Sequence, residues 1–232
     1  MPFFKSILSL LFVLIVFLCK SQVDISEINL NKVPQKKVRE YLIEQQHNQI
    51  VSLTDIKPSV YTDSKTEGFK TQSKEYFLKD SLSKVWQHYL VTNPGDSWNG
   101  NKVSFGMLYS KKEDRIVYRD DNVSHLDTGQ VVYLNLKLLK GIMNLATVFE
   151  FINIDRKKRM IEFSYIDGNI TEGKQRLQFT EDTKGHTHIW HTSLYKSNSA
   201  FRDRFLYPFF HEKLSNEFHR NMKKLFYKNQ SN

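Results

Sequence analysis

Several polar residues in the second half of the chain have the side-chain types and the spacing to act together inside an apolar shell. Apolar and polar residues alternate along four runs between residues 147 and 196, which predicts strands whose successive side chains face opposite sides. The alternation places five polar side chains on the predicted inward faces: Tyr165, Gln175, His191, Ser193 and Tyr195. Glu150 joins them if Val148, Ile152 and Ile154 mark the inner face of their strand.

Two explanations fit this polar cluster, because a buried polar group without a partner costs a few kcal/mol. In the first, Glu150, His191 and the tyrosines hydrogen-bond to one another in a satisfied internal network. In the second, they fix the polar end of an apolar ligand, as polar groups do in most small-molecule sites. His191 with Glu150 or Tyr195 also has the chemistry of a general base, and an enzyme would use this arrangement.

Other reactive motifs give weak signals. His186 and His188 have the spacing to share one strand face, but no third ligand can be named, so no metal site is predicted. The sequence contains no phosphate-binding loop, nucleophile elbow or dinucleotide fingerprint. We therefore expect no cofactor.

The N-terminus has the pattern of a secretory signal peptide. Lys5 precedes an apolar run from Ile7 to Leu18, and small residues follow the run. The run is shorter than the roughly 20 residues that a membrane-spanning helix needs. We expect cleavage between Ser21 and Gln22 and export to the periplasm or the medium, with an uncleaved anchor as the alternative.

Cys19 is the only cysteine, and it lies inside the expected signal peptide. After cleavage at Ser21 the mature chain has no cysteine, which excludes disulfides, thiol nucleophiles and cysteine-ligated metals. Lipid attachment at Cys19 is the alternative, although Leu18 stands where a lipoprotein signal has a small residue.

The chain is moderately basic. Its formal net charge is +9, and cleavage removes Lys5 and Lys20, which leaves +7. The excess is spread along the chain without a run of five or six like charges, which favours a solvated basic surface over nucleic-acid binding. A basic surface also attracts anionic lipid headgroups, so a membrane surface is one expected partner.

The mature sequence divides into a leader, residues 22–72, and a main domain, residues 73–228. The leader contains a predicted helix at Pro34–Gln46 and an irregular connection. The main domain begins with a short strand at 75–79 and a helix at 80–90. Further strands are predicted at 103–109, 115–119, 130–139, 147–154, 159–166, 173–180 and 186–196. With short turns between them, these runs predict an antiparallel meander.

A long amphipathic helix closes the chain between Pro208 and Lys228. Apolar residues recur at helical spacing along it: Phe210, Leu214, Phe218, Met222 and Leu225. Such a broad stripe needs a sheet to lie on. The 17 Phe, 11 Tyr and 3 Trp residues are enough to build a large core or to line a sizeable apolar cavity.

The order of these elements resembles the START-like, or SRPBCC, superfamily. The resemblance covers about residues 73–227 and rests on a strand, a helix that opens with Ser-x-x-x-Val-Trp at Ser81 to Trp86, the antiparallel strands and the C-terminal helix. It implies an α+β helix-grip fold, in which a curved antiparallel sheet wraps around the C-terminal helix. It also implies a cavity between them for a lipid, a sterol or another apolar molecule.

Combined with the alternation, the resemblance implies a set of ligand-binding residues around this cavity. They are Phe105, Tyr133, Phe163, Tyr165, Gln175, Phe179, His191, Tyr195, Phe210, Leu214 and Phe218. We expect an exported, non-enzymatic binding protein for a hydrophobic small molecule. The alternatives are a cyclase or hydrolase that uses His191, Glu150 and Tyr195, and an envelope protein that docks a partner through its leader.

Overall fold

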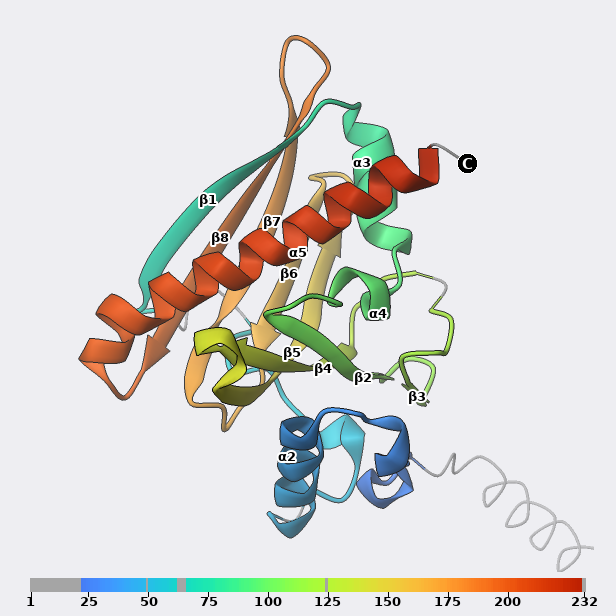
Figure 1. Cartoon of the computed structure of the whole chain (residues 1–232), viewed down its shortest axis with the longest axis vertical. Coiled ribbons are helices and arrows are strands. Elements are labelled where there is room, and N and C mark those ends of the chain that lie inside the picture. The colour runs from blue at the N-terminus through green and yellow to red at the C-terminus, as the bar shows by residue number, and fades with distance from the viewer. Residues whose placement is uncertain (1–21, 49, 62–65, 124, 231–232) are drawn as a thin grey trace, which may run out of the picture.

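In the part of the chain that the structure describes, eight antiparallel strands form one curved sheet. The computed structural model describes residues 22–48, 50–61, 66–123 and 125–230 (Figure 1). The strand order in the sheet is β1-β8-β7-β6-β5-β4-β2-β3. The strands are β1 (Lys70–Leu78), β2 (Val103–Ser110), β3 (Arg115–Val117), β4 (Gln130–Leu138), β5 (Met143–Asp155), β6 (Met160–Tyr165), β7 (Thr171–Glu181) and β8 (Thr187–Ser197). Each strand from β4 to β7 pairs with the one that follows it, which confirms the predicted meander.

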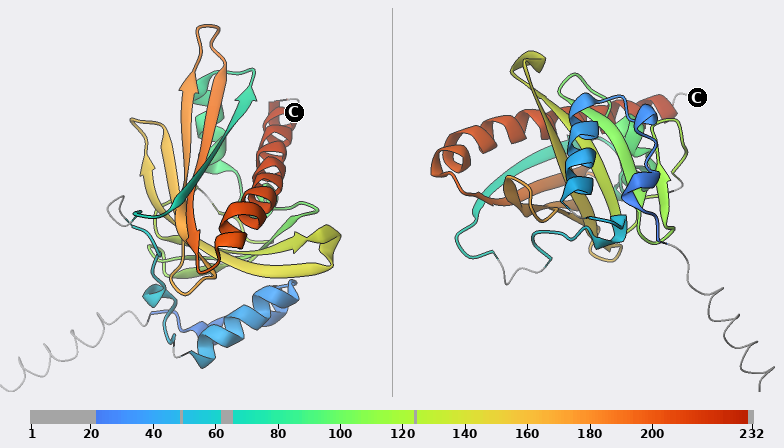
Figure 2. Two further views of the ribbon diagram at one scale, coloured as in Figure 1. Left: turned by 90° about the vertical axis from the view of Figure 1, so that its left-hand side faces the viewer. Right: turned by 90° about the horizontal axis from the view of Figure 1, so that it is seen from below.

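The concave face of this sheet is covered by helices. Helix α5 (Tyr207–Gln230) runs along the face and follows a π-helical turn, η6 (Arg202–Leu206). Helices α3 (Leu82–Val91) and α4 (Pro94–Ser97) lie near the C-terminal half of α5 (Figures 1 and 2). The predicted α+β helix-grip fold is confirmed by this arrangement.

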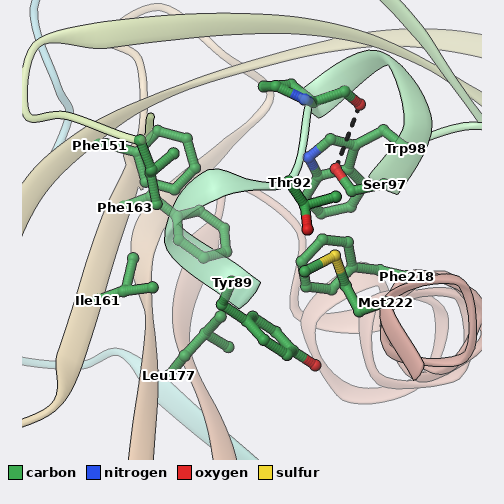
Figure 3. Close-up of a pocket in the computed structure, with 12 residues that line it drawn as sticks. Tyr89, Thr92, Ser97, Trp98, Phe151, Ile161, Phe163, Leu177, Phe218 and Met222 are labelled. Carbon is green, nitrogen blue, oxygen red and sulfur yellow. Dashed lines mark hydrogen bonds between the residues drawn. The ribbon is translucent and has the colours of Figure 1, made fainter. Parts of the chain in front are cut away.

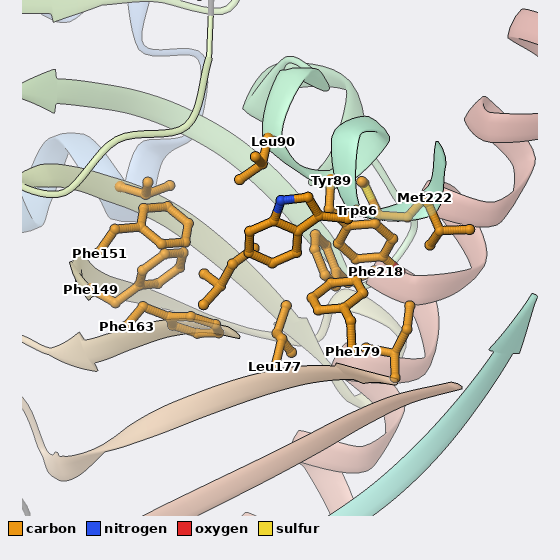
Figure 4. Packing of buried hydrophobic residues seen from close by; sticks show 14 of the residues in the cluster. Trp86, Tyr89, Leu90, Phe149, Phe151, Phe163, Leu177, Phe179, Phe218 and Met222 are labelled. Carbon is orange, nitrogen blue, oxygen red and sulfur yellow. The ribbon is translucent and has the colours of Figure 1, made fainter. Parts of the chain in front are cut away.

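Aromatic side chains fill the space between the sheet and the C-terminal half of α5 (Figure 4). Trp86 of α3 meets Phe179 of β7 edge to face, with ring centroids 5.2 Å apart. Trp98 stacks on Phe218 of α5 at 4.1 Å. Aromatic pairs of this kind contribute about 1 kcal/mol each beyond the area they bury. This half of the fold is therefore a packed core.

The leader covers the part of the convex face that β2, β4 and β5 form. It consists of η1 (Ile25–Glu27), η2 (Leu30–Lys32), α2 (Lys36–His47) and η3 (Leu53–Asp55). Its buried residues, with Val38 and Leu42 of α2 among them, form a second core with the outer residues of β2, β4 and β5. The leader thus shields apolar side chains that a bare sheet would expose. None of the described helices combines the length and hydropathy needed to cross a membrane.

Two β-bulges change which side chains face inward. The register of β2 with β4 shifts between Phe105 and Met107, at Gly106, and that of β5 with β6 shifts between Phe151 and Asn153. A Cβ at Gly106 would come within 3.0 Å of Val38 in the leader, so the glycine allows this close approach. Because a bulge inserts one residue, the alternation reverses across it. The predicted common face of Val103, Phe105, Met107 and Tyr109 is therefore wrong, since the first two face α5 and the last two face the leader.

Candidate functional site

A groove with a volume of about 700 Å³ lies between the first turns of α5 and the sheet, at the start of β2 and the end of β4. Five of its lining residues are apolar: Leu138, Leu139, Phe209, Phe210 and Leu214. The other five are Asn101, Lys102, Lys137, Lys140 and Lys213. The lining of the groove thus combines apolar side chains with basic ones.

The tip of the β4–β5 hairpin builds one wall of the groove. Leu139, Lys140 and Gly141 follow one another there with φ values of 49°, 60° and 90°. Left-handed backbone costs a non-glycine residue about 1 kcal/mol, and two such residues in succession are uncommon. Backbone of this kind clusters at functional sites, and here it turns the chain so that Leu139 and Lys140 reach the groove.

Glu217 of α5 fixes the helix against the opposite wall. Its buried carboxylate accepts hydrogen bonds from the backbone N–H groups of Asn101 (2.9 Å), Lys102 (2.7 Å) and Val103 (3.0 Å). Hydrogen bonds to a charged acceptor are stronger than neutral ones. Gly100 leaves room for the carboxylate, because a Cβ there would lie 2.4 Å from it. One helix turn before Glu217, Lys213 and Leu214 face the groove.

The charge around the groove is positive. Its described lining holds four lysines and no carboxylate, although Glu217 approaches Lys102 to within 3.9 Å. The Lys213 ammonium lies 3.7 Å from the centroid of the Phe209 ring, within the range of a cation–π contact. An anionic group at the groove mouth would meet several donors that carry the opposite charge.

The interior beneath the C-terminal half of α5 has little free volume. A cavity of about 30 Å³ lies among Tyr89, Trp98, Phe163 and Phe218 and their neighbours (Figure 3). A single water needs a volume of about 10–15 Å³ on this scale, so the cavity has room for one or two waters. This cavity is too small for a lipid.

A buried hydrogen-bond network connects the interior with the N-terminal half of α5. The Tyr89 hydroxyl lies 2.9 Å from His219 Nδ1, and His219 Nε2 lies 3.0 Å from His191 Nδ1. Gln175 Oε1 lies 2.7 Å from His191 Nε2 and 2.9 Å from His211 Nε2. These residues come from α3, β7, β8 and α5, so the network ties the helices to the sheet.

The acceptor at Gln175 determines which nitrogens of the imidazoles carry hydrogen. An amide oxygen only accepts, so His191 and His211 each donate from Nε2. His191 Nδ1 then accepts from His219 Nε2, and the Tyr89 hydroxyl donates to His219 Nδ1. In this arrangement His191 and His219 are neutral, and both ring nitrogens of each have a partner.

Burial keeps these imidazoles neutral. Desolvation lowers the pKa of His211 to about 4 and that of His219 to about 3, and the neighbouring His211 adds to the second shift. Desolvation, followed by the proximity of His219 and His211, puts the pKa of His191 well below its usual range.

The network ends in a second group of hydroxyls, since Gln175 Nε2 donates to Tyr165, which lies 2.9 Å from Tyr207.

Most of the predicted inward residues are on the concave side. They belong to three different regions, which are the packed core, the hydrogen-bond network and the groove. Phe105, Phe163, Phe179 and Phe218 belong to the packed core. Tyr165, Gln175 and His191 belong to the hydrogen-bond network. Of the predicted ligand-binding set, Phe210 and Leu214 line the groove.

Three residues lie apart from the sites in which they were predicted, namely Tyr133, Glu150 and Tyr195. Tyr133 lies on the convex face, where its hydroxyl donates to Gln45 of α2, because its neighbours Val132 and Leu134 take the face toward α5. Glu150 also faces the leader and pairs with Lys111 at 2.7 Å. Desolvation raises the pKa of Glu150 above its ordinary value. The predicted pairing of Glu150 with His191 is therefore wrong.

Tyr195 is on the predicted inward face but does not contact His191. Its hydroxyl donates to the backbone carbonyl of Asp203 at 3.2 Å, and its ring stacks on Tyr207 at 3.8 Å. His191, Glu150 and Tyr195 thus form no common site. Among the described residues, no group of three or more His, Cys, Asp or Glu side chains is placed to hold a metal ion. His188 instead contacts Glu75 and Asp182.

The sequence did not predict that the lysines and the exposed Phe209 belong to a site. Lys102, Lys137, Lys140 and Lys213 come from three separate segments, and Phe209 lies off the apolar stripe of α5. The doublet Phe209–Phe210 was the available signal, because a helix that buries one face has no need for a second large apolar residue beside its stripe.

No protein-family model matches the sequence, and no curated protein matches it. Among solved structures, norcoclaurine synthase from Thalictrum flavum is similar at 14% identity and a TM-score of 0.50, over 68% of this chain and 86% of that chain. A point mutant of that enzyme in complex with a transition state analogue is 13% identical with a TM-score of 0.50, over 70% and 96% of the two chains. Major latex-like protein 151 from Panax ginseng is 12% identical with a TM-score of 0.49, over 68% and 97%. At these identities the similarity to norcoclaurine synthase shows the fold alone, and it confirms the predicted helix-grip fold.

Proposed function

We propose that the protein binds an amphiphilic molecule with an apolar body and an anionic end, and that it does so without catalysing a reaction on it. The carrying observation is the groove of about 700 Å³, in which five apolar residues and four lysines meet. Pockets for small molecules have volumes of roughly 300–1,000 Å³ and combine an apolar lining with a few polar groups. The groove has both properties.

The groove offers separate contacts for the apolar body and for the anionic end of the ligand. The apolar body would lie along Phe210 and Leu214 on α5 and Leu138 on β4, and each buried CH₂ group would contribute about 0.8 kcal/mol. The anionic end would lie near Lys137 and Lys140, where ammonium groups are available as donors.

The comparison with solved structures supports this proposal at the level of the fold. Norcoclaurine synthase from Thalictrum flavum has a similar fold, and a structure of its point mutant contains a transition state analogue. A helix-grip chain can therefore hold a small molecule. The network at His191 supports a non-enzymatic role, because its polar atoms bond to one another rather than project into the groove.

A titration with a dansyl-labelled fatty acid, followed by displacement with unlabelled palmitate and with hexadecanol, tests the proposal. We expect saturable dansyl emission that palmitate displaces about tenfold better than the uncharged alcohol, a difference of about 1.4 kcal/mol. Phe210→Asp should abolish binding, and Lys137→Glu with Lys140→Glu should remove the preference for palmitate.

Two matched controls accompany these variants. Trp190→Asp replaces an aromatic side chain that is 45% exposed on the opposite face of β8, and Lys224→Glu reverses a charge on the solvent side of α5. Both should bind as the parent does. Binding that is unaffected by Phe210→Asp, or no saturable binding at all, would contradict the proposal.

We also propose that the chain is exported. The support is the signal pattern before Gln22, which lies outside the described residues. The intact mass of the protein from its native host tests this proposal. A mass that starts at Gln22 indicates a cleaved soluble form, and a mass that starts at an acylated Cys19 indicates a lipid-anchored form. A chain that still begins at Met1 in the cytoplasmic fraction would refute export.

A further inference from the structure

A row of exposed aromatic residues leads up to the groove along η6 and α5. Phe201, Phe205 and Phe209 follow one another at intervals of four residues, and their side chains are 62%, 55% and 51% exposed. Residues four apart lie on one side of a helix. The first two rings contact each other, with centroids 5.4 Å apart. These phenylalanines serve no packing role comparable to that of Phe218.

The tip of the β4–β5 hairpin exposes a second apolar surface. Ile142 is 88% exposed, and Leu139 is 54% exposed. The tip and the aromatic row meet at the groove, because Leu139 and Phe209 both line it. Exposed apolar side chains from two separate elements thus border one opening. Contiguous apolar surface of this kind marks a site of interaction with a protein or a membrane.

The cations beside these residues identify the partner. Lys137 and Lys140 lie at the hairpin, and Lys213 and Arg204 lie on α5 and η6, next to the rings of Phe209 and Phe205. Aromatic and aliphatic tips flanked by lysine and arginine suit the boundary between headgroups and acyl chains. Each basic residue near an anionic membrane surface contributes about 1 kcal/mol.

We propose that this face docks on an anionic lipid bilayer, with Phe201, Phe205 and Ile142 inserted and the groove opening toward the lipid. A second copy of the chain is a poorer occupant, because a twofold contact would bring the same lysines opposite one another. The inference goes beyond the proposed function and does not depend on it, because docking uses side chains around the groove whether or not a ligand fills it.

A fluorophore at the hairpin tip tests the docking on the full chain. Cys19→Ser removes the natural thiol, and Ile142→Cys provides the only site for an NBD label. The control carries the same label at Trp190→Cys, on the convex side of β8. A local label is needed because the apolar run at residues 7–18 can itself bring the chain to a membrane.

We expect NBD emission to rise at position 142, and not at 190, on vesicles of phosphatidylcholine with phosphatidylglycerol. Vesicles of phosphatidylcholine alone should give a much smaller rise, and about 1 M salt should suppress it. Lys140→Gln and Lys213→Gln should each weaken the titration about fivefold. Phe201→Ser with Phe205→Ser should abolish the signal at 142, and since these side chains are half exposed, the thermal midpoint should stay unchanged.

Two results would overturn the proposal. A label at 142 that remains in water on anionic vesicles would show that the face does not insert. A rise at 142 that depends on protein concentration without vesicles would show that the face binds a second copy instead. Failure of the fatty-acid titration, by contrast, would refute the groove ligand and leave the insertion of Ile142 to be judged by its own label.

Discussion

The two halves of α5 face very different surroundings. The C-terminal half, with Phe218, Met222 and Phe226, packs against α3, α4 and the sheet around a cavity of about 30 Å³. The N-terminal half, with Phe209, Phe210 and Leu214, borders a groove of about 700 Å³. The fold is the same along the whole helix. Capacity for a ligand therefore depends on what covers each part of the helix, and here it belongs to the N-terminal half.

The difference has a structural cause. Helix α3 supplies Trp86 and Tyr89 to the space beneath the C-terminal half of α5, and Trp98, directly after α4, joins them. Neither helix lines the groove at the other half, where the β4–β5 hairpin forms the wall instead. The network around His191 and His219 lies between the two halves.

The largest expected effect is a loss of stability in acid, which arises at the buried histidines of the hydrogen-bond network. Unfolded histidines take up protons near pH 6.5, whereas His211 does so only near 4 and His219 near 3. Between those values the unfolded state binds more protons, so stability is fully present above about pH 7 and falls as the pH falls. At about pH 5 the two residues together should cost about 4 kcal/mol in the free energy of unfolding.

Urea unfolding at a series of pH values measures this loss. The lowered pKa values of His191 and His88, which desolvation causes, act in the same direction, and the raised pKa of His188 beside Glu75 acts against it. His219→Gln keeps a hydrogen-bonding side chain but removes one titrating group, so it should flatten the pH dependence by about 2 kcal/mol. An unchanged slope in that variant would contradict the assignment.

Truncation of one phenylalanine in each half tests the comparison directly. Phe218→Ala removes a ring that stacks on Trp98 in the core and should destabilise the protein by about 3–4 kcal/mol. Phe210→Ala, in the half-buried lining of the groove, should cost less than about 1.5 kcal/mol. Equal losses in urea unfolding would mean that the groove is part of the core.

A smaller effect is expected where Glu217 holds α5 to the start of β2. Glu217→Gln leaves one acceptor oxygen for three backbone N–H groups and should cost about 2 kcal/mol. Glu212→Gln is the matched control, because its pair with Lys74 is exposed and should contribute less than about 1 kcal/mol. Thermal unfolding compares the two variants, and similar losses would refute the role given to Glu217.

Alternation predicted the inward faces of β6, β7 and β8 correctly, with Phe163, Gln175 and His191 inside. It failed at Met107 and Glu150, because bulges in β2 and β5 shift the pattern by one residue. Gly106 was a signal for the first bulge, since an isolated glycine in a strand often marks one. The residue Ile152, at the second bulge, gave no such sign.

The groove could be predicted only in part. Phe210 and Leu214 follow from the helical period, but Lys102, Lys137 and Lys140 approach α5 only through the pairing of β2 with β4 and the turn at Leu139. Periodicity also cannot say whether aromatic residues on two facing elements enclose a cavity or fill it. Here Trp98 and Phe218 fill it.

The most direct test of the central claim is methyl NMR of the protein during a titration with palmitate. The open half of α5 should respond, so that the methyl signals of Leu138, Leu139 and Leu214 shift progressively and saturate. The signals of Leu90, Leu177 and Met222 in the packed half should stay in place. Shifts confined to Leu90, Leu177 and Met222, with the groove methyls unmoved, would contradict the account.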